Sequence, residues 1–418
     1  MNHTQNDSPA SFAKTTLDNG VRVISERIPS VRSVSVGIWI LAGSRDEEVH
    51  QAGISHFIEH MVFKGTKKRR MHHIAQRMEA VGGYLNAFTS KEYTCYFARA
   101  LDEHLERAVD TLCDLVLSPN FPEKEISKEK DVVLEEMKMY EDSPEDLIFD
   151  RFESVVYEDH ELGRPVIGYP ETVMSLDREQ LRSYVDRTYA PDRIVLAAAG
   201  NVDHDQVVRF ARTSLAELSR ATRAPIRTPL NGYSARSVEE YRPIQQAHAA
   251  LGTRGLDVHD EDRVALTVLN TILGGGMSSR LNQNIREKYG FCYNVYSFMN
   301  MHSDSGDFGV YIGTDVQKVD RAMQLIMREL QKLVDVPVSS RMMNQAKNQV
   351  RGSVMLGLES MSNRMMRIGR QELYFERYIS LDEINADVEA VSADDVQRVA
   401  EKMFEEGRFS SVILLPTA

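Results

Sequence analysis

Two histidines and a glutamate lie close together in the segment AGISHFIEHMVFKGT, residues 52–66. His56, Glu59 and His60 are spaced at i, i+3 and i+4, so a helix would place all three side chains on one face. Two imidazoles on one face can hold a divalent metal, and a carboxylate beside them can accept a proton from water held by that metal. The order H-x-x-E-H therefore indicates a hydrolytic metal site.

A pair of histidines can share a helix face by chance. The chain contains 12 histidines, so a single His pair at i, i+4 could simply belong to a solvated helix face. The glutamate at i+3 makes a chance match much rarer, because three positions must then coincide. We therefore interpret the segment as metal-binding.

A third metal ligand must come from another part of the chain, since a catalytic zinc usually takes three protein ligands and leaves a fourth position for water. Residues 123–141 are polar, lack Gly and Pro, and predict a long helix rich in carboxylates. Glu129 and Glu136 are seven residues apart and would share one face of that helix. The residues alone do not choose between Glu135 and Glu136 as the ligand.

Strands and helices alternate around these segments. The β-branched patterns VRVISERI and SVSVGIWI predict strands within residues 12–28 and at 33–40, each with a face against a core. Further strands are predicted at residues 84–88, 93–99 and 194–200, and helices at 71–81, 105–116, 144–157, 178–188 and 204–218. This half of the chain is therefore expected to be α+β.

The length of 418 residues favours more than one domain. Residues 220–242 lose periodicity and gather prolines, so we interpret 220–243 as a linker. It would join an N-terminal α+β domain, residues 1–219, to a C-terminal α+β domain, residues 244–418.

The two halves resemble each other. Residues 96–116 match residues 310–330, and residues 174–200 match residues 391–416, each time with the same order of strand and helix. Two similar domains related by internal duplication are therefore expected. Residues 265–276, the counterpart of the H-x-x-E-H segment, carry no His or Glu, so only the first half can hold a metal in this way.

Charge and cysteine content exclude several classes. The net charge of −12 argues against a nucleic-acid partner and is compatible with basic substrates. Cys95, Cys113 and Cys292 are widely spaced and form no C-x-x-C pair, which excludes a disulfide scaffold and a thiolate zinc site. No apolar run approaches the roughly 20 residues that cross a bilayer, and residues 1–16 resemble no targeting segment. We expect a cytoplasmic protein without a membrane partner.

Three stretches together resemble the M16 metallopeptidase family, which includes pitrilysin, insulysin and the mitochondrial processing peptidase. They are H-x-x-E-H, GGYLNAFTSKEYT at residues 82–94 and VLEEM at residues 133–137. The likeness covers nearly the whole chain and is greatest to short bacterial members similar to the processing peptidase's β subunit. It implies two similar α+β domains of the LuxS/MPP-like type, facing each other across a cleft.

The resemblance also implies a ligand set, carried over position by position. His56, His60 and Glu136 match the family's zinc ligands, with one Zn²⁺ per chain, and Glu59 matches its general base. Glu129 matches the supporting carboxylate of the same helix, which would orient a ligand through a hydrogen bond.

Substrate contacts follow from the same resemblance. Asn86, Ala87 and Phe88 match the edge strand on which family members bind an extended peptide through main-chain hydrogen bonds. Arg286 and Tyr293 match an arginine and a tyrosine that reach the substrate carbonyl and the developing oxyanion. Without the resemblance, we would interpret these two as ordinary surface and core residues.

We therefore expect a zinc-dependent endopeptidase that cleaves short or unfolded peptides in a closed chamber formed by a homodimer. The acidic balance suggests a preference for basic, Arg-containing peptides. The alternative is a non-catalytic family member that presents substrates or serves a structural role. Such members usually lose part of H-x-x-E-H, which is complete in this sequence.

Overall fold

The structure is a computed structural model in which the described residues are 11–216, 218–219, 227–230, 232–405 and 407–417. Much of the predicted linker lies outside them, at residues 220–226 and 231. The predicted cytoplasmic location rests partly on residues 1–10, which also lie outside them. No described helix combines the length and the apolar character needed to cross a membrane.

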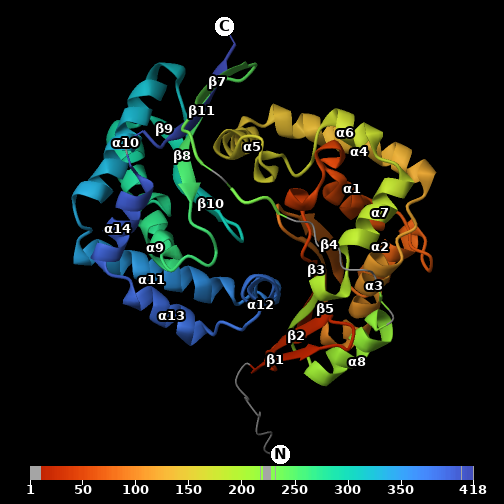
Figure 1. Cartoon of the computed structure of the whole chain (residues 1–418). Helices are drawn as coiled ribbons and strands as arrows, with labels where there is room; N and C mark the ends of the chain where they lie inside the picture. Colours follow the sequence, from red (N-terminus) through yellow and green to blue (C-terminus); the bar gives the residue numbers. More distant parts are fainter. Residues whose placement is uncertain (1–10, 217, 220–226, 231, 406, 418) are drawn as a thin grey trace, which may run out of the picture. The chain divides into compact units, whose positions relative to one another are not determined.

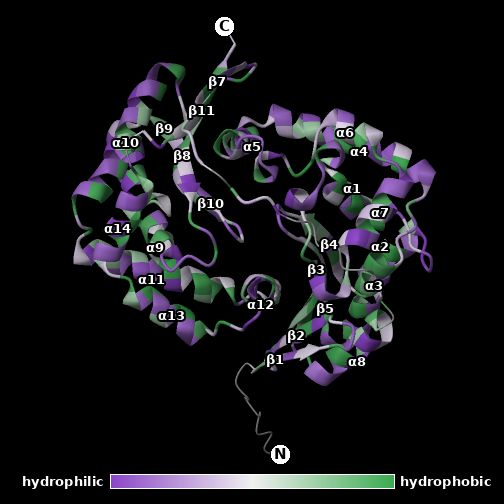
Figure 2. Ribbon diagram, in the orientation of Figure 1, coloured by the Kyte–Doolittle hydropathy of each residue, from purple (hydrophilic) through white to green (hydrophobic). Residues whose placement is uncertain are grey.

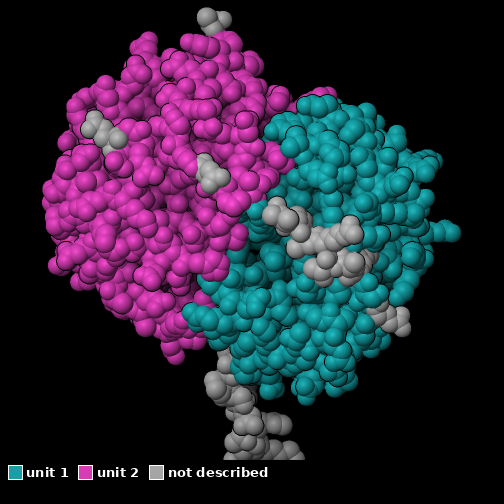
Figure 3. Space-filling view, in the orientation of Figure 1, with its two compact units in different colours: residues 1–137, 165–227, 357–378 teal, residues 138–164, 228–356, 379–418 magenta. Residues whose placement is uncertain are grey.

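The chain forms two compact units, each built on one β-sheet with helices on its faces (Figure 1 and Figure 3). Unit 1 consists of residues 1–137, 165–227 and 357–378, and unit 2 of residues 138–164, 228–356 and 379–418. Neither unit is continuous in sequence. This division differs from the predicted boundaries at 219 and 244, because each unit takes one segment from the other half of the chain.

Unit 1 contains a six-stranded sheet in which only one neighbouring pair, β2 and β6, is parallel. The strand β4 lies at one edge and β1 at the other. In spatial order the strands are β1 (Ser11–Thr16), β2 (Arg22–Arg27), β6 (Ile194–Gly200), β3 (Ser33–Ile40), β5 (Thr94–Leu101) and β4 (Tyr84–Thr89).

Unit 2 contains a five-stranded sheet, again with one parallel pair, β7 and β11. In spatial order its strands are β7 (Ser237–Arg242), β11 (Ser410–Pro416), β8 (Ala247–Gly255), β10 (Gly306–Thr314) and β9 (Cys292–Met301). These five strands repeat the order and the directions of β2, β6, β3, β5 and β4 in unit 1. The prediction of two similar α+β domains is confirmed.

The predicted linker was too long at its C-terminal end. Ser237–Arg242 forms strand β7, which pairs in parallel with β11. The sequence SVEEYR has an apolar residue only at Val238 and Tyr241, and Tyr241 is largely exposed, so this edge strand lacks the apolar alternation that marks the other strands.

Helices are present at the predicted residues 71–81, 105–116, 123–141, 144–157 and 178–188, and from residue 204. Those at residues 170–175, 340–357, 361–375 and 381–390 were not predicted. Most helices show one apolar and one polar side (Figure 2). In unit 1 they are α1 (Ile54–Val62), α2 (Met71–Glu79), α3 (Leu105–Leu117), the first part of α4 (Glu123–Asp142), α6 (Pro170–Ser175), α7 (Arg178–Thr188), α8 (His204–Leu215) and α12 (Met361–Phe375). In unit 2 they are α5 (Pro144–Tyr157), α9 (Arg263–Gly274), α10 (Val319–Asp335), α11 (Ser340–Gly357), α13 (Leu381–Ala390) and α14 (Ala393–Met403).

Each sheet is buried on both faces, and one face is covered by a helix from the other half of the chain. In unit 1, Val36 and Ile38 of β3 face the main core, whereas Trp39 faces a second cluster to which α12 contributes Met365 and Ile368. In unit 2, α5 packs on β8 and β11 in the same way. The amphipathic pattern of a helix does not state which sheet it covers, so the sequence did not reveal this exchange.

The contact between α12 and the unit 1 sheet requires a glycine. Gly369 lies so close to the indole of Trp39 that a Cβ atom would overlap the ring, and Trp39 is fully buried. The overlapped atoms belong to a rigid aromatic ring in a packed core, which cannot move aside without disturbing its neighbours.

Gly369→Ala is therefore expected to lower the free energy of unfolding by about 1–3 kcal/mol through overpacking. Gly352→Ala in α11 is the matched control, since nothing lies within 4 Å of the added Cβ there, and it should stabilise the helix by about 0.5–1 kcal/mol. Urea unfolding followed by far-UV circular dichroism measures both. Equal effects at the two positions would contradict this account of the α12 contact.

Candidate metal centre

Helix α1 presents the H-x-x-E-H residues on its one accessible face. Within Ile54–Val62, the residues other than His56, Glu59 and His60 are buried in the core of unit 1. The helix begins after Gly53, whose φ of 92° is in the left-handed region that glycine adopts without strain. The apolar face therefore fixes α1 against the core and leaves the three polar side chains pointing away from it.

Helix α4 brings a carboxylate to the two imidazoles. The distance from His60 Nε2 to Glu136 Oε2 is 3.5 Å, and that from His56 Nε2 to Glu136 Oε1 is 3.8 Å. One ligand atom from each of the three residues lies within 4.8 Å of the others. Glu135, the alternative that the sequence left open, is exposed on α4.

These distances fit a zinc ion. Zinc binds imidazole nitrogen and carboxylate oxygen at about 2.0–2.2 Å, which places two ligands of a tetrahedron roughly 3.3–3.6 Å apart. The two distances to Glu136 are at or slightly above this range, and all three donor atoms lie within 4.8 Å of one another. Two nitrogens and one oxygen also form a donor set typical of catalytic zinc, with a fourth position left open.

Glu129 holds His60 in place. The Nδ1–H of His60 donates to Glu129 Oε1 at 2.9 Å, and this leaves Nε2 directed at Glu136. Lys64 approaches the second oxygen of Glu129 at 2.7 Å. Lys64 was not predicted to take part. Its position four residues after His60 was the available signal, because that spacing returns to the same helix face.

The pKa values of the two imidazoles are shifted in opposite directions. Burial, with a smaller effect from the charge of His60, lowers the pKa of His56 to about 3 and keeps this imidazole neutral. Burial alone would also lower the pKa of His60, but the hydrogen bond to Glu129 and the charge of Glu136 outweigh it and raise this pKa. Neutral imidazole is the form that binds metal.

Glu59 lies beside this group and has its own partner. Thr89 Oγ1, at the end of β4, donates to Glu59 Oε2 at 2.5 Å. Burial raises the pKa of Glu59, although the hydrogen bond from Thr89 opposes the shift. Thr89 was also missed. It follows Ala87 by two residues and therefore lies on the same face of the strand, which was the signal in the sequence.

The predicted substrate strand is an edge strand, as expected. β4 ends the sheet of unit 1 and pairs on one side with β5. Asn86 is exposed, and its Oδ1 accepts the N–H of Ala87 at 2.9 Å. Phe88 is partly buried and packs edge-on against Trp39.

Arg286 and Tyr293 lie next to each other in unit 2. Arg286 belongs to a π-helical turn, Asn282–Glu287, and its guanidinium carbon is 5.2 Å from the centre of the Tyr293 ring. Tyr293 is 76% exposed, so it is not the core residue that its aromatic side chain alone would suggest. The two residues are thus brought together with each other in unit 2, whereas the imidazoles and Glu136 belong to unit 1.

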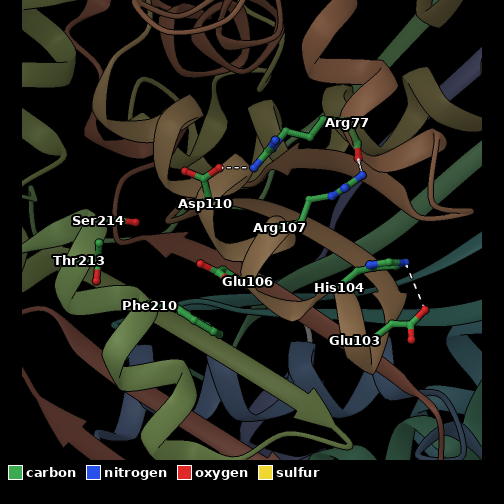
Figure 4. A pocket seen from close by; sticks show the side chains of 9 residues that line it. All are labelled: Arg77, Glu103, His104, Glu106, Arg107, Asp110, Phe210, Thr213 and Ser214. Carbon is green, nitrogen blue, oxygen red and sulfur yellow. Dashed lines mark hydrogen bonds and ion pairs between the residues drawn. The ribbon is translucent and has the colours of Figure 1, made fainter.

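A pocket of about 380 Å³ on unit 1 has a different character (Figure 4). Its charges compensate each other, as where Arg77 binds Asp110. The arginines and carboxylates that line it include none of the predicted site residues. We assign this pocket no role in the chemistry of the site.

Comparison with protein families finds two matches that together span most of the chain. Residues 22–169 match the model described as insulinase, peptidase family M16. Residues 175–350 match the model described as the peptidase M16 inactive domain.

Among similar curated proteins is the uncharacterized zinc protease YmxG of Bacillus subtilis, 40% identical over 94% of this chain and 95% of its own. An uncharacterized zinc protease of Streptomyces coelicolor is 41% identical over 96% of this chain and 89% of its own. Among solved structures, a protease from Helicobacter pylori has a TM-score of 0.92 at 23% identity, covering 97% of this chain and 100% of its own. The last similarity shows a shared fold.

Glu136→Gln is expected to weaken zinc binding by more than the roughly 10–100-fold that loss of an outer-shell group causes, because it removes a charged ligand. Glu135→Gln, one residue away and exposed, is the matched control and should bind zinc like the unaltered protein. Competition with a chromophoric chelator measures the affinity. Similar losses in both variants would remove Glu136 from the ligand set.

Proposed function

The chain belongs to peptidase family M16, and from this premise we propose that it is a zinc-dependent endopeptidase with His56, His60 and Glu136 as zinc ligands. Its relatives in Bacillus and Streptomyces are named zinc proteases and match it over nearly their whole length. The observation that carries the proposal is the approach of three donor atoms to within 4.8 Å of one another, with Glu59 beside them on the same helix.

His56, His60 and Glu136 would hold the zinc, which when bound would supply a Lewis acid for a carbonyl oxygen and make water nucleophilic near neutral pH. Glu59 then acts as the general base: its carboxylate takes the proton of the attacking water and passes it to the leaving amine. The raised pKa of Glu59 suits this role, because a proton that has been accepted must be held before it is delivered. Thr89 fixes one carboxylate oxygen and so orients the other.

Glu129 serves as a positioning residue in this proposal. It touches no reacting atom, and its hydrogen bond to His60 Nδ1 fixes the tautomer that leaves Nε2 free to bind metal. Lys64 keeps Glu129 ionised, since the hydrogen bonds from His60 and Lys64 outweigh burial and lower the pKa of this carboxyl group.

Arg286 and Tyr293 are proposed to stabilise the oxyanion that forms on the substrate carbonyl. A guanidinium and a phenol are both strong donors, and electrostatic stabilisation of this kind often makes the largest contribution to catalysis. The exposure of Tyr293 supports this role. The side chain is 76% exposed, so packing in the core does not explain why an aromatic ring lies at this position.

We further propose that peptides bind in extended form along β4, through its free edge. Asn86 now occupies the N–H of Ala87, so an incoming strand would displace this side chain and take over the donor. Main-chain pairing of this kind tolerates many sequences. It suits an enzyme for short or unfolded peptides.

The assembly and the location stay part of the proposal. We propose a homodimer that encloses the substrate in a chamber, and a cytoplasmic enzyme. Light scattering distinguishes a dimer from a single chain of 47.5 kDa.

A non-catalytic role is the rival function. The observation in its favour is that residues 175–350 match the model described as an inactive domain. That half carries α9 in the place of α1, without His or Glu among residues 265–276. The first half retains both imidazoles, Glu59 and Glu136, and this complete set favours the peptidase.

Glu59→Gln tests the proposed base. The variant is expected to keep its zinc, because Glu59 is no ligand, while peptide cleavage falls about 10²–10⁴-fold with the loss of general-base catalysis. Digestion of a peptide mixture, analysed by mass spectrometry beside metal analysis, measures both quantities. A variant that keeps its zinc and cleaves at the original rate would contradict the mechanism.

Basic peptides are expected to be cleaved faster than acidic peptides of the same length, because the net charge of −12 attracts cations. The preference should shrink as added salt screens the charges. Values of kcat/KM for a matched pair, with Lys and Arg in one peptide and Glu and Asp in the other, measure it. Equal values at low salt would remove this part of the proposal.

A further inference from the structure

A buried charged turn precedes the helix that carries the two imidazoles. This turn, residues 43–47, joins β3 to α1 and contains three consecutive charged residues. Arg45, Asp46 and Glu47 are 2%, 5% and 4% exposed. Burying a charge costs several kcal/mol unless a partner compensates for it, so the contacts of this turn need an explanation.

Ionic and main-chain contacts hold the turn to the rest of unit 1. Arg45 binds Glu92 at 2.8 Å, and Arg227 binds both carboxylate oxygens of Asp46, at 3.0 and 3.1 Å. Arg227 also donates to Glu92 at 2.8 Å. The N–H groups of Ser44 and Arg45 donate to the backbone carbonyls of residues 90 and 91. The turn is therefore fixed from several sides.

Glu47 connects this fixed turn to α1. One carboxylate oxygen accepts the N–H of Gly53 at 2.7 Å, and the other accepts the N–H of Ser55 at 2.8 Å. The N-cap residue is Gly53, which has no side chain to accept these hydrogen bonds. Glu47 thus replaces the missing cap, and its negative charge suits the positive end of the helix.

A second link joins the same two elements. The hydroxyl groups of Ser55 and Tyr184 lie 2.7 Å apart, and Tyr184 donates to the backbone carbonyl of Gly43. Ser55 lies in the first turn of α1, directly before His56, and Gly43 begins the 43–47 turn, so Tyr184 bridges the two elements. The first turn is therefore the part of the helix that the 43–47 turn controls.

The two imidazoles differ in what holds them. His60 is held directly, through Nδ1, by Glu129. The Nδ1 of His56 is buried and has no hydrogen-bond partner among the described residues. The direction of His56 therefore depends on packing and on the backbone of the first helical turn, in which it is the third residue. That backbone is what Glu47 holds.

We propose that Glu47 is a positioning residue of the metal centre: it fixes the first turn of α1 and thereby aims His56 at the metal. The proposal rests on the metal site described under Proposed function and adds a residue that touches neither metal nor substrate. Glu47 orients His56 through the backbone, as Glu129 orients His60 through the side chain.

The test compares Glu47→Gln with Glu48→Gln. The amide has a single acceptor oxygen, so it can satisfy only one of the two N–H groups and turns its own donor towards the other. Glu48 is the next carboxylate along the chain, exposed and paired with Arg187 on the surface. It controls for a change of net charge close to the helix.

Glu47→Gln is expected to weaken zinc binding about 10–100-fold, to alter the visible spectrum of the cobalt-substituted protein, and to lower kcat with little change in KM. Glu48→Gln should match the unaltered protein in all three. Cobalt d–d bands report ligand geometry, which a loss of stability in a protein that remains folded would not change. Circular dichroism and Trp39 fluorescence establish that the variants are folded.

An unchanged cobalt spectrum and zinc affinity in folded Glu47→Gln would overturn the proposal. If that variant does not fold, Glu47→Asp takes its place, since the shorter carboxylate keeps the charge and cannot reach both N–H groups. An unchanged spectrum in this second variant would overturn the proposal equally. Failure of the unaltered protein to bind zinc would instead refute the proposed function, so the two failures are distinguishable.

Discussion

The hydrogen bond from His60 to Glu129 is the interaction on which the site depends. It joins α1 to α4, between which the chain forms two further α-helices and two strands, and it sets which nitrogen of His60 faces Glu136. Glu129 and Glu136 lie two turns apart on α4, so the carboxylate that orients the imidazole also sets the position of the carboxylate that faces it. The hydrogen bond between His60 and Glu129 therefore also fixes how His60 faces Glu136.

Burial on both faces of the sheets provides the rigid support for this contact. α1 packs its apolar face into the main core of unit 1, and α12 covers the opposite face of the same sheet. Because α12 comes from the second half of the chain and α5 from the first, neither unit can complete its core from its own half. Each sheet therefore has one face covered by a helix from the other half of the chain.

Much of this could be predicted from the sequence, because it depends on local pattern. The lack of Gly and Pro over residues 123–141 located α4, internal similarity indicated the duplication, and spacing on one helix placed His56, Glu59 and His60 together. The rest depends on contacts between distant segments. Periodicity could not choose Glu136 over Glu135 or assign α12 to unit 1, and no local pattern indicates that Glu47 holds α1 from outside the helix.

X-ray absorption at the zinc edge of the purified protein would identify the ligands of this site, because it reports the atoms around the metal without reference to activity. We expect one zinc per chain with two imidazole nitrogens and a carboxylate oxygen, at about 2.0–2.2 Å. Loss of one imidazole contribution in His56→Ala would assign the signal to this site. Sulfur ligands at about 2.3 Å, or a spectrum unaffected by that substitution, would contradict it.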